Sequence, residues 1–441
     1  MWSNASKLRD LLLLTKDGEW GKGEPEQGHT EALVIRGTDF AAVRRDDIES
    51  VPIRYIDNTL LERKRLCVGD ILIETAGGTK GQPTGRTVII REALLQRAQR
   101  AVTCASFARF LRADPTKVLP EYLYWWLQEM YRSGQMDQHQ VQHTGIARFQ
   151  YTRFADSVLV PLPPRAAQER IAEILDAMEQ RIAVLRRMNK TLESIAEALF
   201  RSWFVDFDPV RSKAEGHQPQ GMTAETAALF PNRLVETPHG KLPASWTWLP
   251  LDRVAQFLNG LALQKFPAGD GESLPVIKIA QLRRGSTDDA DRASNGIPPE
   301  YVVHDGDILF SWSGSLLVSM WAGGRGALNQ HLFKVTSTAY PKWFCLFWCK
   351  EHLPEFQRIA QAKATTMGHI QRHHLTQALV VVPSPELIEE ASRFFEPLLA
   401  RGLASTLEAR TLIELRDTLL PKLLSGQVRF KDAEAQLAAS I

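Results

Sequence analysis

The sequence predicts an α+β protein built as a tandem repeat, in which each of two α/β lobes precedes a long helix. Internal similarity carries this prediction, because a missed repeat changes the whole fold assignment. Three pairs of segments match in the same order: "EALVIRGTDF" with "LPVIKIAQL", "VGDILIETAGG" with "DGDILFSWSGS", and "SVLVPLPP" with "ALVVVPSP". Each copy has short apolar strands between Gly-containing turns, and a long helical pattern follows it. A chain of 441 residues, 44% hydrophobic and 24% charged, is long enough for two or three domains with buried cores.

These patterns divide the chain into six segments. The repeated strands locate the lobes, and prolines locate the helix starts and the connector between the two halves. The segments are a first lobe (1–163), a first long helix (164–204), a connector (205–245), a second lobe (246–383), a second long helix (384–425) and a C-terminal tail (426–441).

The two long helices are predicted to pair as an antiparallel coiled coil. Apolar residues in the first helix recur in steps of three and four, which is the spacing of a heptad seam. These residues are Ile171, Leu175, Met178, Ile182, Leu185, Leu192 and Leu199. The second helix has the equivalent residues Phe395, Leu398, Leu412, Leu415 and Leu419. Some 40 residues of helix would span roughly 60 Å, at about 1.5 Å per residue.

Asn189 occupies a seam position of the first helix where an apolar residue is expected. A buried Asn at such a position fixes helix register at some cost in stability. The alternative is an exposed Asn near the edge of the seam. The first interpretation predicts that Asn189→Leu raises the melting temperature and loosens the pairing.

Composition excludes several classes of protein. Four scattered cysteines do not make a disulfide framework and favour a reducing, cytoplasmic setting. No apolar run reaches the roughly 18 residues of a membrane span, and the N-terminus does not resemble a signal peptide, so we expect a protein that is not exported. The net charge is only +2, although Lys80 to Arg153 holds eleven basic against five acidic residues. That segment could form a basic face or an ordinary solvated surface.

Motifs that could carry catalysis have simpler explanations. "GGTKGQPTGR" (77–86) lacks the Gly-Lys-Ser/Thr ending of a phosphate loop, and a basic loop near a polyanion fits it better. Only Asp70 and Asp307 recur in the "VGD" and "DGD" turns, which favours strand-opening turns over a metal site. The histidines of "MGHIQRHHL" have no carboxylate or cysteine partner at ligand spacing. We therefore expect a recognition component that is not an enzyme and holds no metal.

Several segments, in the right order, resemble the DNA specificity subunit of type I restriction–modification systems. "QERIAEILDAMEQRI" and "ALFRSWFVDFDPV" are similar to the central helix and its exit, and "LRDTLLPKLLSGQV" is similar to the C-terminal helix. "VGDIL", "DGDIL" and "LNQHLFKV" are similar to core segments of the target recognition domains. The second helix departs from the family pattern because it lacks the glutamine that the first has at Gln168.

The resemblance implies that each lobe is a target recognition domain reading one half of a bipartite, asymmetric duplex DNA sequence. The helical pair would then act as a ruler, with half-sites on the order of one helical turn apart. The implied partners are two methyltransferase subunits that modify adenine N6 with S-adenosylmethionine, and restriction subunits that translocate DNA with ATP and Mg²⁺. The chain itself would hold no cofactor and would reside in the cytoplasm.

Candidate DNA contacts are polar side chains that lie beside basic ones in the repeated loops. In the first lobe they are Thr79, Lys80, Gln82, Arg86, His143, Thr144, Arg148 and Gln150. In the second lobe they are Ser311, Ser313, Asn329, Gln330, His331, Thr366, His369 and Gln371. Arg and Lys would contact phosphate or read guanine, and Asn and Gln suit adenine. The alternative for each is an ordinary surface loop.

The aromatic exit of the first helix is a candidate contact with a partner subunit. Its residues are Leu199, Phe200, Trp203 and Phe204. Packing within the chain explains the same pattern equally well. Two other functions remain open from the residues alone: a coiled-coil scaffold that binds only proteins, and an enzyme with an unrecognised site.

Overall fold

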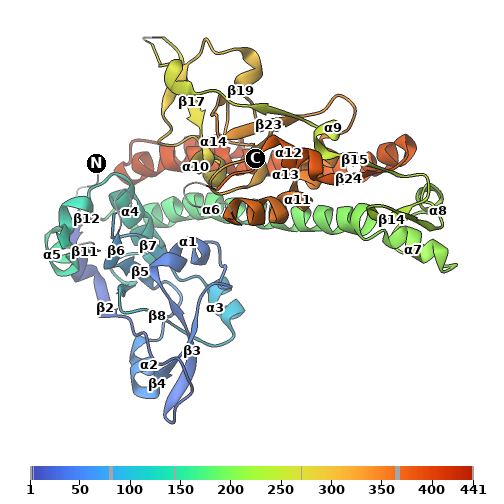
Figure 1. Cartoon of the computed structure of the whole chain (residues 1–441). Coiled ribbons are helices and arrows are strands. Elements are labelled where there is room, and N and C mark those ends of the chain that lie inside the picture. The colour runs from blue at the N-terminus through green and yellow to red at the C-terminus, as the bar shows by residue number, and fades with distance from the viewer. Residues whose placement is uncertain are drawn as a thin grey trace. The chain divides into compact units, whose positions relative to one another are not determined.

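A computed structural model describes residues 2, 4–78, 83–143, 146–269, 271–362 and 368–439. Contacts divide the chain into two compact units. The first unit is Met1–Ala183 with Thr411–Ile441, and the second unit is Val184–Arg410. Each unit contains one β-rich lobe and part of each long helix, α6 (Arg165–Phe200) and α13 (Pro385–Ser425) (Figure 1).

Two main sheets and two smaller ones form the first lobe. The four-stranded sheet has the order β2-β9-β5-β7, and the three-stranded sheet has the order β4-β3-β8 with β3 and β8 parallel. Their strands are β2 (Leu12–Asp17), β9 (Ala108–Ala113), β5 (Ile71–Glu74), β7 (Thr87–Ile89), β4 (Ile53–Asp57), β3 (His29–Ile35) and β8 (Ala101–Cys104). The smaller sheets are β1 (Ala5–Lys7) with β12 (Leu159–Pro161), and β10 (Gln140–His143), β11 (Ile146–Phe149) and β6 (Ala76–Gly78).

The second lobe repeats this topology. Its first sheet has the order β16-β23-β20-β21, and its second has β18-β17-β22-β19 with β17 and β22 parallel. The strands are β16 (Gln256–Asn259), β23 (Leu332–Thr336), β20 (Ile308–Ser311), β21 (Val318–Met320), β18 (Arg292–Ser294), β17 (Ser273–Ile277), β22 (Gly326–Leu328) and β19 (Val302–Val303). A further pair joins β15 (Thr247–Pro250) to β24 (Leu379–Val382). The predicted fold class, a tandem repeat of mixed lobes with two long helices, is confirmed.

The central strand of each lobe begins at a Gly-Asp turn. The Asp70 carboxylate accepts a hydrogen bond from the Cys67 backbone N–H at 2.7 Å, and the Asp307 carboxylate accepts one from the His304 N–H at 2.8 Å. The glycine before each aspartate has a positive φ, 86° and 88°, which glycine adopts without strain. Turn formation therefore accounts for both aspartates.

Helices inserted in the lobes bury aromatic side chains against the sheets. α4 (Pro120–Arg132) buries Tyr122, Tyr124 and Trp125, and α11 (Lys342–Ala362) buries Trp343, Phe344 and Trp348. Shorter helices follow the repeated loops, namely α5 (Tyr151–Ser157) in the first lobe and α12 (Arg372–Gln377) in the second. Within the described residues, no helix combines the length and apolar character that a membrane crossing requires.

In the first unit, the two long helices meet through apolar residues and one buried ion pair. Seam residues of α6, such as Ile171 and Leu175, share a core with Leu419 and Leu423 of α13. Arg416 also donates to the carboxylate of Glu179, which is 4% exposed. Burial by itself would raise the pKa of Glu179, but the charges of Arg416, Arg44 and Arg91, with the hydrogen bond from Arg416, together outweigh it and the pKa is lowered.

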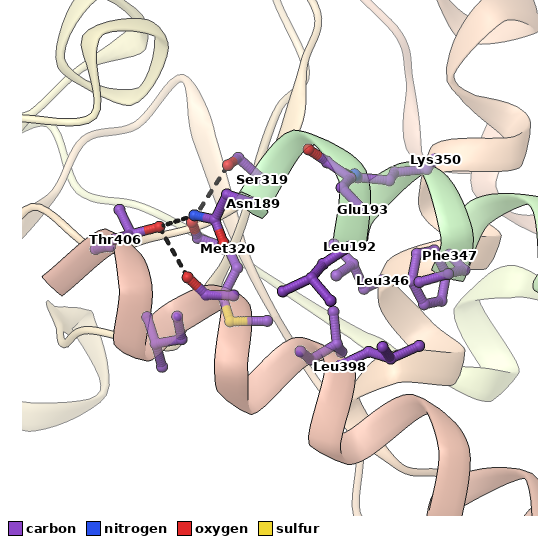
Figure 2. Close-up of a pocket in the computed structure, with 15 residues that line it drawn as sticks. Asn189, Leu192, Glu193, Ser319, Met320, Leu346, Phe347, Lys350, Leu398 and Thr406 are labelled. Atoms are coloured by element: carbon purple, nitrogen blue, oxygen red, sulfur yellow. Dashed lines mark hydrogen bonds and ion pairs between the residues drawn. The ribbon is translucent and has the colours of Figure 1, made fainter. Parts of the chain in front are cut away.

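In the second unit, a neutral polar pair takes this place. The side-chain N–H of Asn189 donates to the Thr406 hydroxyl, and that hydroxyl donates to the Gly402 carbonyl at 2.9 Å (Figure 2). Farther along α6, Phe200 packs on Phe395 of α13, so residue numbers rise on one helix as they fall on the other. The pairing is therefore antiparallel, and Asn189 lies at the interface as predicted.

The two long helices begin differently. Gln168 is 4% exposed, and its amide donates to the Pro163 carbonyl at 3.0 Å and accepts from the Leu119 N–H at 2.9 Å. At the start of α13, the Ser384 hydroxyl accepts from the Leu387 N–H at 3.3 Å. The glutamine of the first helix thus fixes the preceding loop, whereas the second helix has a serine cap.

The segments predicted as connector and tail contain regular structure. α6 passes into a π-helical turn, Arg201–Val205, and α7 (Asp208–Ala214) begins around Pro209. The connector also contains α8 (Ala224–Ala228) and a hairpin of β13 (Leu234–Thr237) and β14 (Gly240–Pro243). The tail contains α14 (Phe430–Ala438), whose Ala433 is buried in the core of the first unit.

Candidate nucleic-acid interface

In each lobe, the same backbone bonds join three segments that are distant in sequence. In the first lobe, Thr75 donates its N–H to the Phe107 carbonyl at 2.8 Å, and its carbonyl accepts from the Phe149 N–H at 2.9 Å. In the second lobe, Trp312 donates to the His331 carbonyl at 3.3 Å and accepts from the Ile370 N–H at 3.0 Å. Both candidate surfaces therefore share one backbone frame, formed where β5 or β20 ends.

A closely packed glycine supports this frame in both lobes. A Cβ added to Gly18 would lie 2.0 Å from the Cys104 carbonyl oxygen. A Cβ added to Gly260 would lie 2.2 Å from the Asn329 carbonyl oxygen. Each glycine directly follows a strand, β2 or β16, that borders the frame. Only a residue without a side chain allows this approach.

In the second lobe, the structure brings together most of the predicted residues that it describes. The Ser313 hydroxyl lies 2.9 Å from Nδ1 of His331, and Asn329 donates its side-chain N–H to Oε1 of Gln330 at 2.9 Å. A β-bridge joins Ser313 to His369. These residues come from the end of β20, the β22–β23 loop and the segment before α12, so they form one polar surface.

Trp312 and Asn259 belong to this surface but were not predicted. The Trp312 indole N–H donates to Oδ1 of Asn259 at 2.8 Å and to the Gln330 carbonyl at 3.2 Å. The Trp312 ring lies 5.9 Å from the rings of both His331 and Phe333. The sequence held one clue to Trp312, which lies between the candidate residues Ser311 and Ser313. A buried tryptophan needs an acceptor for its indole N–H, so a polar partner nearby could have been expected.

Ser311 is corrected to a structural role. It is fully buried, its hydroxyl donates to the Ser315 carbonyl at 2.7 Å, and it accepts from the Leu317 N–H at 2.9 Å. Both bonds close the turn between β20 and β21, so the side chain does not face a ligand. Gln371, by contrast, is exposed at the start of α12.

In the first lobe, Arg86 is held by a buried acid. Its guanidinium contacts the Glu74 carboxylate at 2.6 and 2.9 Å, and Glu74 is only 2% exposed. The hydrogen bonds that Arg86 donates to Glu74 raise the pKa of Arg86 above its ordinary value. Arg86 is therefore a fixed cation, whose side chain is 22% exposed.

Two other predicted residues lie on or directly after β11, the strand that pairs with the first repeated loop. Arg148 is exposed on β11, the middle strand of the sheet β10-β11-β6, and its Cα is paired with Ala76. Gln150 follows β11 and caps α5, with its backbone N–H donating to the His139 carbonyl at 2.7 Å. Thr79, Lys80, Gln82, Thr144 and Thr366 lie outside the described residues, as does the side chain of His143, so those contacts stay predictions.

The first lobe has a second arginine fixed by a carboxylate, Arg109, which the sequence analysis did not predict. Arg109 contacts the Asp17 carboxylate at 2.9 and 2.7 Å, and its guanidinium lies 4.6 Å above the Tyr151 ring. Arg109 lies on β9 and Asp17 ends β2, so the pair forms across two neighbouring strands. A spacing of 92 residues along the chain gives no local pattern by which sequence reasoning could find it.

Among the described residues, no group of His, Cys, Asp and Glu gathers as ligands of a metal would. The neighbouring histidines of α12, His373 and His374, contact one another with tilted rings whose centroids lie 3.9 Å apart. The polar surfaces of the two lobes consist of amides, hydroxyls, imidazoles and guanidinium groups, and in the first lobe carboxylates hold the guanidinium groups. Such groups recognise nucleic acids through hydrogen bonds to phosphates and base edges.

Comparison with known proteins agrees with this chemistry. A family model described as the type I restriction modification DNA specificity domain matches residues 30–194. The chain is also 24% identical over 319 residues to the type I restriction enzyme HindI specificity subunit of Haemophilus influenzae, covering 62% of this chain and 69% of that protein. Residues 30–194 of this chain are thus similar to the type I DNA specificity domain.

Two further known proteins are similar to this chain over nearly its whole length. The type I restriction enzyme MjaIX specificity subunit of Methanocaldococcus jannaschii is 21% identical over 98% of each chain. The crystal structure of the type I restriction–modification S subunit from M. genitalium matches with a TM-score of 0.56 at 14% identity, over 95% of each chain, which shows a shared fold.

The aromatic exit of the first helix is buried in the second unit of the chain. Phe200, Trp203 and Phe204 are at most 3% exposed and belong to the core of the second unit. Phe200 contacts the Trp348 ring at 5.2 Å, and Leu199 is half-buried against the same core. Burial within the chain favours core packing over partner contact, because the three rings leave almost no surface for another subunit.

Proposed function

We propose that the chain reads a bipartite, asymmetric duplex DNA sequence, with one half-site per lobe. The observation that carries the proposal is the shared backbone frame with different side chains. The first lobe offers guanidinium groups fixed by carboxylates, and the second offers amides and imidazoles fixed by an indole. Identical frames with different hydrogen-bonding groups would read two different short sequences.

The long helices support the gapped character of this target. A helix of 36 residues, such as α6, extends about 54 Å at about 1.5 Å per residue. One turn of duplex DNA rises about 34 Å. We therefore propose that the helical pair sets an unread spacer on the order of one turn between the half-sites.

The chain would direct catalytic partners to this target. We assign adenine-N6 methylation to two methyltransferase subunits that use S-adenosylmethionine, and DNA translocation and cleavage to restriction subunits that use ATP and Mg²⁺. In this proposal the specificity subunit holds no cofactor and acts in the cytoplasm, where it meets chromosomal DNA.

Selection from a random duplex library by the complex of this chain with its methyltransferase partners tests the proposal. The expected result is two short, different half-sites separated by a fixed number of unselected base pairs. Inserting one base pair into the spacer should then abolish binding, because it rotates one half-site by about 34° and shifts it by about 3.4 Å. Enrichment of one ungapped sequence, or of none, would contradict the proposal.

A further inference from the structure

The orientation of the amides in the second lobe is set by groups that can only donate. An indole N–H has no acceptor capacity, so the Asn259 atom 2.8 Å from Trp312 Nε1 is its carbonyl oxygen. The backbone N–H of His331 also only donates, and it approaches Oδ1 of Asn329 at 3.3 Å. The ambiguity between O and N that usually attaches to amides is therefore removed at both residues.

The orientation of the Asn329 amide also fixes the orientation of the Gln330 amide. With Oδ1 of Asn329 facing the His331 N–H, its Nδ2 donates to Oε1 of Gln330 at 2.9 Å. Asn329 is 3% exposed and is therefore shielded from water that could reverse this arrangement. Gln330 must then direct its –NH₂ group away from Asn329. We call Asn259, Asn329 and Gln330 the amide cluster.

The outer members of the amide cluster present donors. Asn259 and Gln330 are each half-buried and turn their oxygens inward. Among the described residues, neither side-chain nitrogen has an acceptor. The Trp312 ring that holds Asn259 itself contacts the rings of His331 and Phe333. The surface thus offers two pre-oriented –NH₂ groups.

We propose, on the basis of the proposed function, that Asn259 and Gln330 determine specificity in the second lobe. Their –NH₂ groups would donate to acceptor atoms on base edges, with guanine preferred over thymine. In the major groove, guanine presents two acceptors, O6 and N7, and thymine presents O4. Cytosine presents only a donor there, and bidentate reading of adenine needs the amide oxygen that is engaged here. This replaces the simpler expectation that Asn and Gln read adenine. Trp312 and Asn329 are positioning residues.

The test uses the complex with its methyltransferase partners and maps methylated sites in a random duplex library. Asn259→Asp and Gln330→Glu each replace the –NH₂ donor by an oxygen acceptor of the same shape. We expect each variant to lose about tenfold in methylation of the wild-type target, or more, at one guanine or thymine of the second half-site. Cytosine should be gained at that position, and the first half-site should not change.

Controls separate this effect from general damage. Gln377→Glu makes the same chemical change at an exposed position of α12 and should leave the motif unchanged. Trp312→Phe removes the indole donor and keeps an aromatic ring, although a smaller one. Asn259 could then turn its oxygen outward, so adenine should be accepted at the position that Asn259 reads. Two variants of the amide cluster are made so that the test still stands if one of them fails to fold. Thermal melts establish that each variant is folded.

The outcomes distinguish the inference from the function on which it rests. A gapped wild-type motif that both folded acidic variants leave unchanged would overturn the role of the amide cluster while bipartite recognition stands. A wild-type complex without a gapped motif would overturn the proposed function itself. A base change confined to the second half-site would support both.

Discussion

The two lobes share a backbone frame but fix their polar side chains by different means. At the position before the close-packed glycine, the first lobe has Asp17, paired with Arg109, where the second has Asn259, held by Trp312. At the end of the central strand, the first lobe has Glu74 and the second has Ser311. The frame thus tolerates charged and neutral sets alike. Folding depends on the glycines and strand register, and recognition chemistry can change without altering them.

The long helices show the same contrast. The pair in the first unit is fixed by the charged contact between Glu179 and Arg416, and the pair in the second unit by the neutral contact between Asn189 and Thr406. The contrast between charged and neutral fixing can therefore be tested in both lobes and along both helices.

Removing the partner of a buried charge should have the largest effect. Arg86→Met should lower the free energy of unfolding by about 3 kcal/mol, because the Glu74 carboxylate would stay buried without its cation. Chemical denaturation near pH 7 measures this. Adding Glu74→Gln should recover most of the loss, and Ser311→Ala, at the equivalent position of the second lobe, should cost only about 1 kcal/mol. Equal losses of stability for Arg86→Met and Ser311→Ala would contradict the contrast between charged and neutral contacts.

Alanine at the close-packed glycines should cost about 2 kcal/mol in each lobe. Gly18→Ala and Gly260→Ala would each place a Cβ within 2.2 Å of a backbone oxygen, which cannot move as a side chain could. Urea unfolding gives the two values. Gly269→Ala is the control, since no atom lies within 4 Å of its Cβ position. A tolerated Gly260→Ala would show that the two frames are not equivalent.

The charged contact between the helices should be sensitive to acid. The pKa of Glu179 is lowered in the folded state, so its stabilisation is present above its unfolded pKa near 4.5 and is lost as the pH falls through the lower folded value. Glu179→Gln should cost roughly 2 kcal/mol near pH 7 and progressively less below about pH 4.5. Unfolding measured from pH 3 to 7 checks this. A cost that does not change with pH would exclude the ion pair as its source.

Replacing the neutral contact should have the smallest effect and the opposite sign. Oδ1 of Asn189 is buried, with no hydrogen-bond partner among the described residues, beside a pocket of about 160 Å³ (Figure 2). Asn189→Leu should fill apolar space and raise stability by about 1 kcal/mol, which a thermal melt detects. Chemical cross-linking between the helices should show looser register. An unchanged melt would contradict the buried role of Asn189.

Sequence reasoning recovered features that depend on local pattern. The Gly-Asp turns, the repeat and the seam of α6 recur at fixed spacing, and the structure shows the second long helix, α13, as Pro385–Ser425. Trp312 with Asn259, and Arg109 with Asp17, were missed because each pair joins distant segments through sheet register. The burial of Ser311 and Phe200 could not be predicted either. The sequence of a polar loop or of an aromatic run is the same whether its side chains are buried in the core or exposed at the surface.

The most direct test of the central claim is single-molecule sequencing of genomic N6-methyladenine, with and without this gene. The account predicts that deletion removes methylation from one gapped motif with two different halves. It also predicts that complementation with the Gln330→Glu variant restores a motif altered in one half only. A motif without a gap, or one altered in both halves by that single change, would contradict the assignment of one half-site to each lobe.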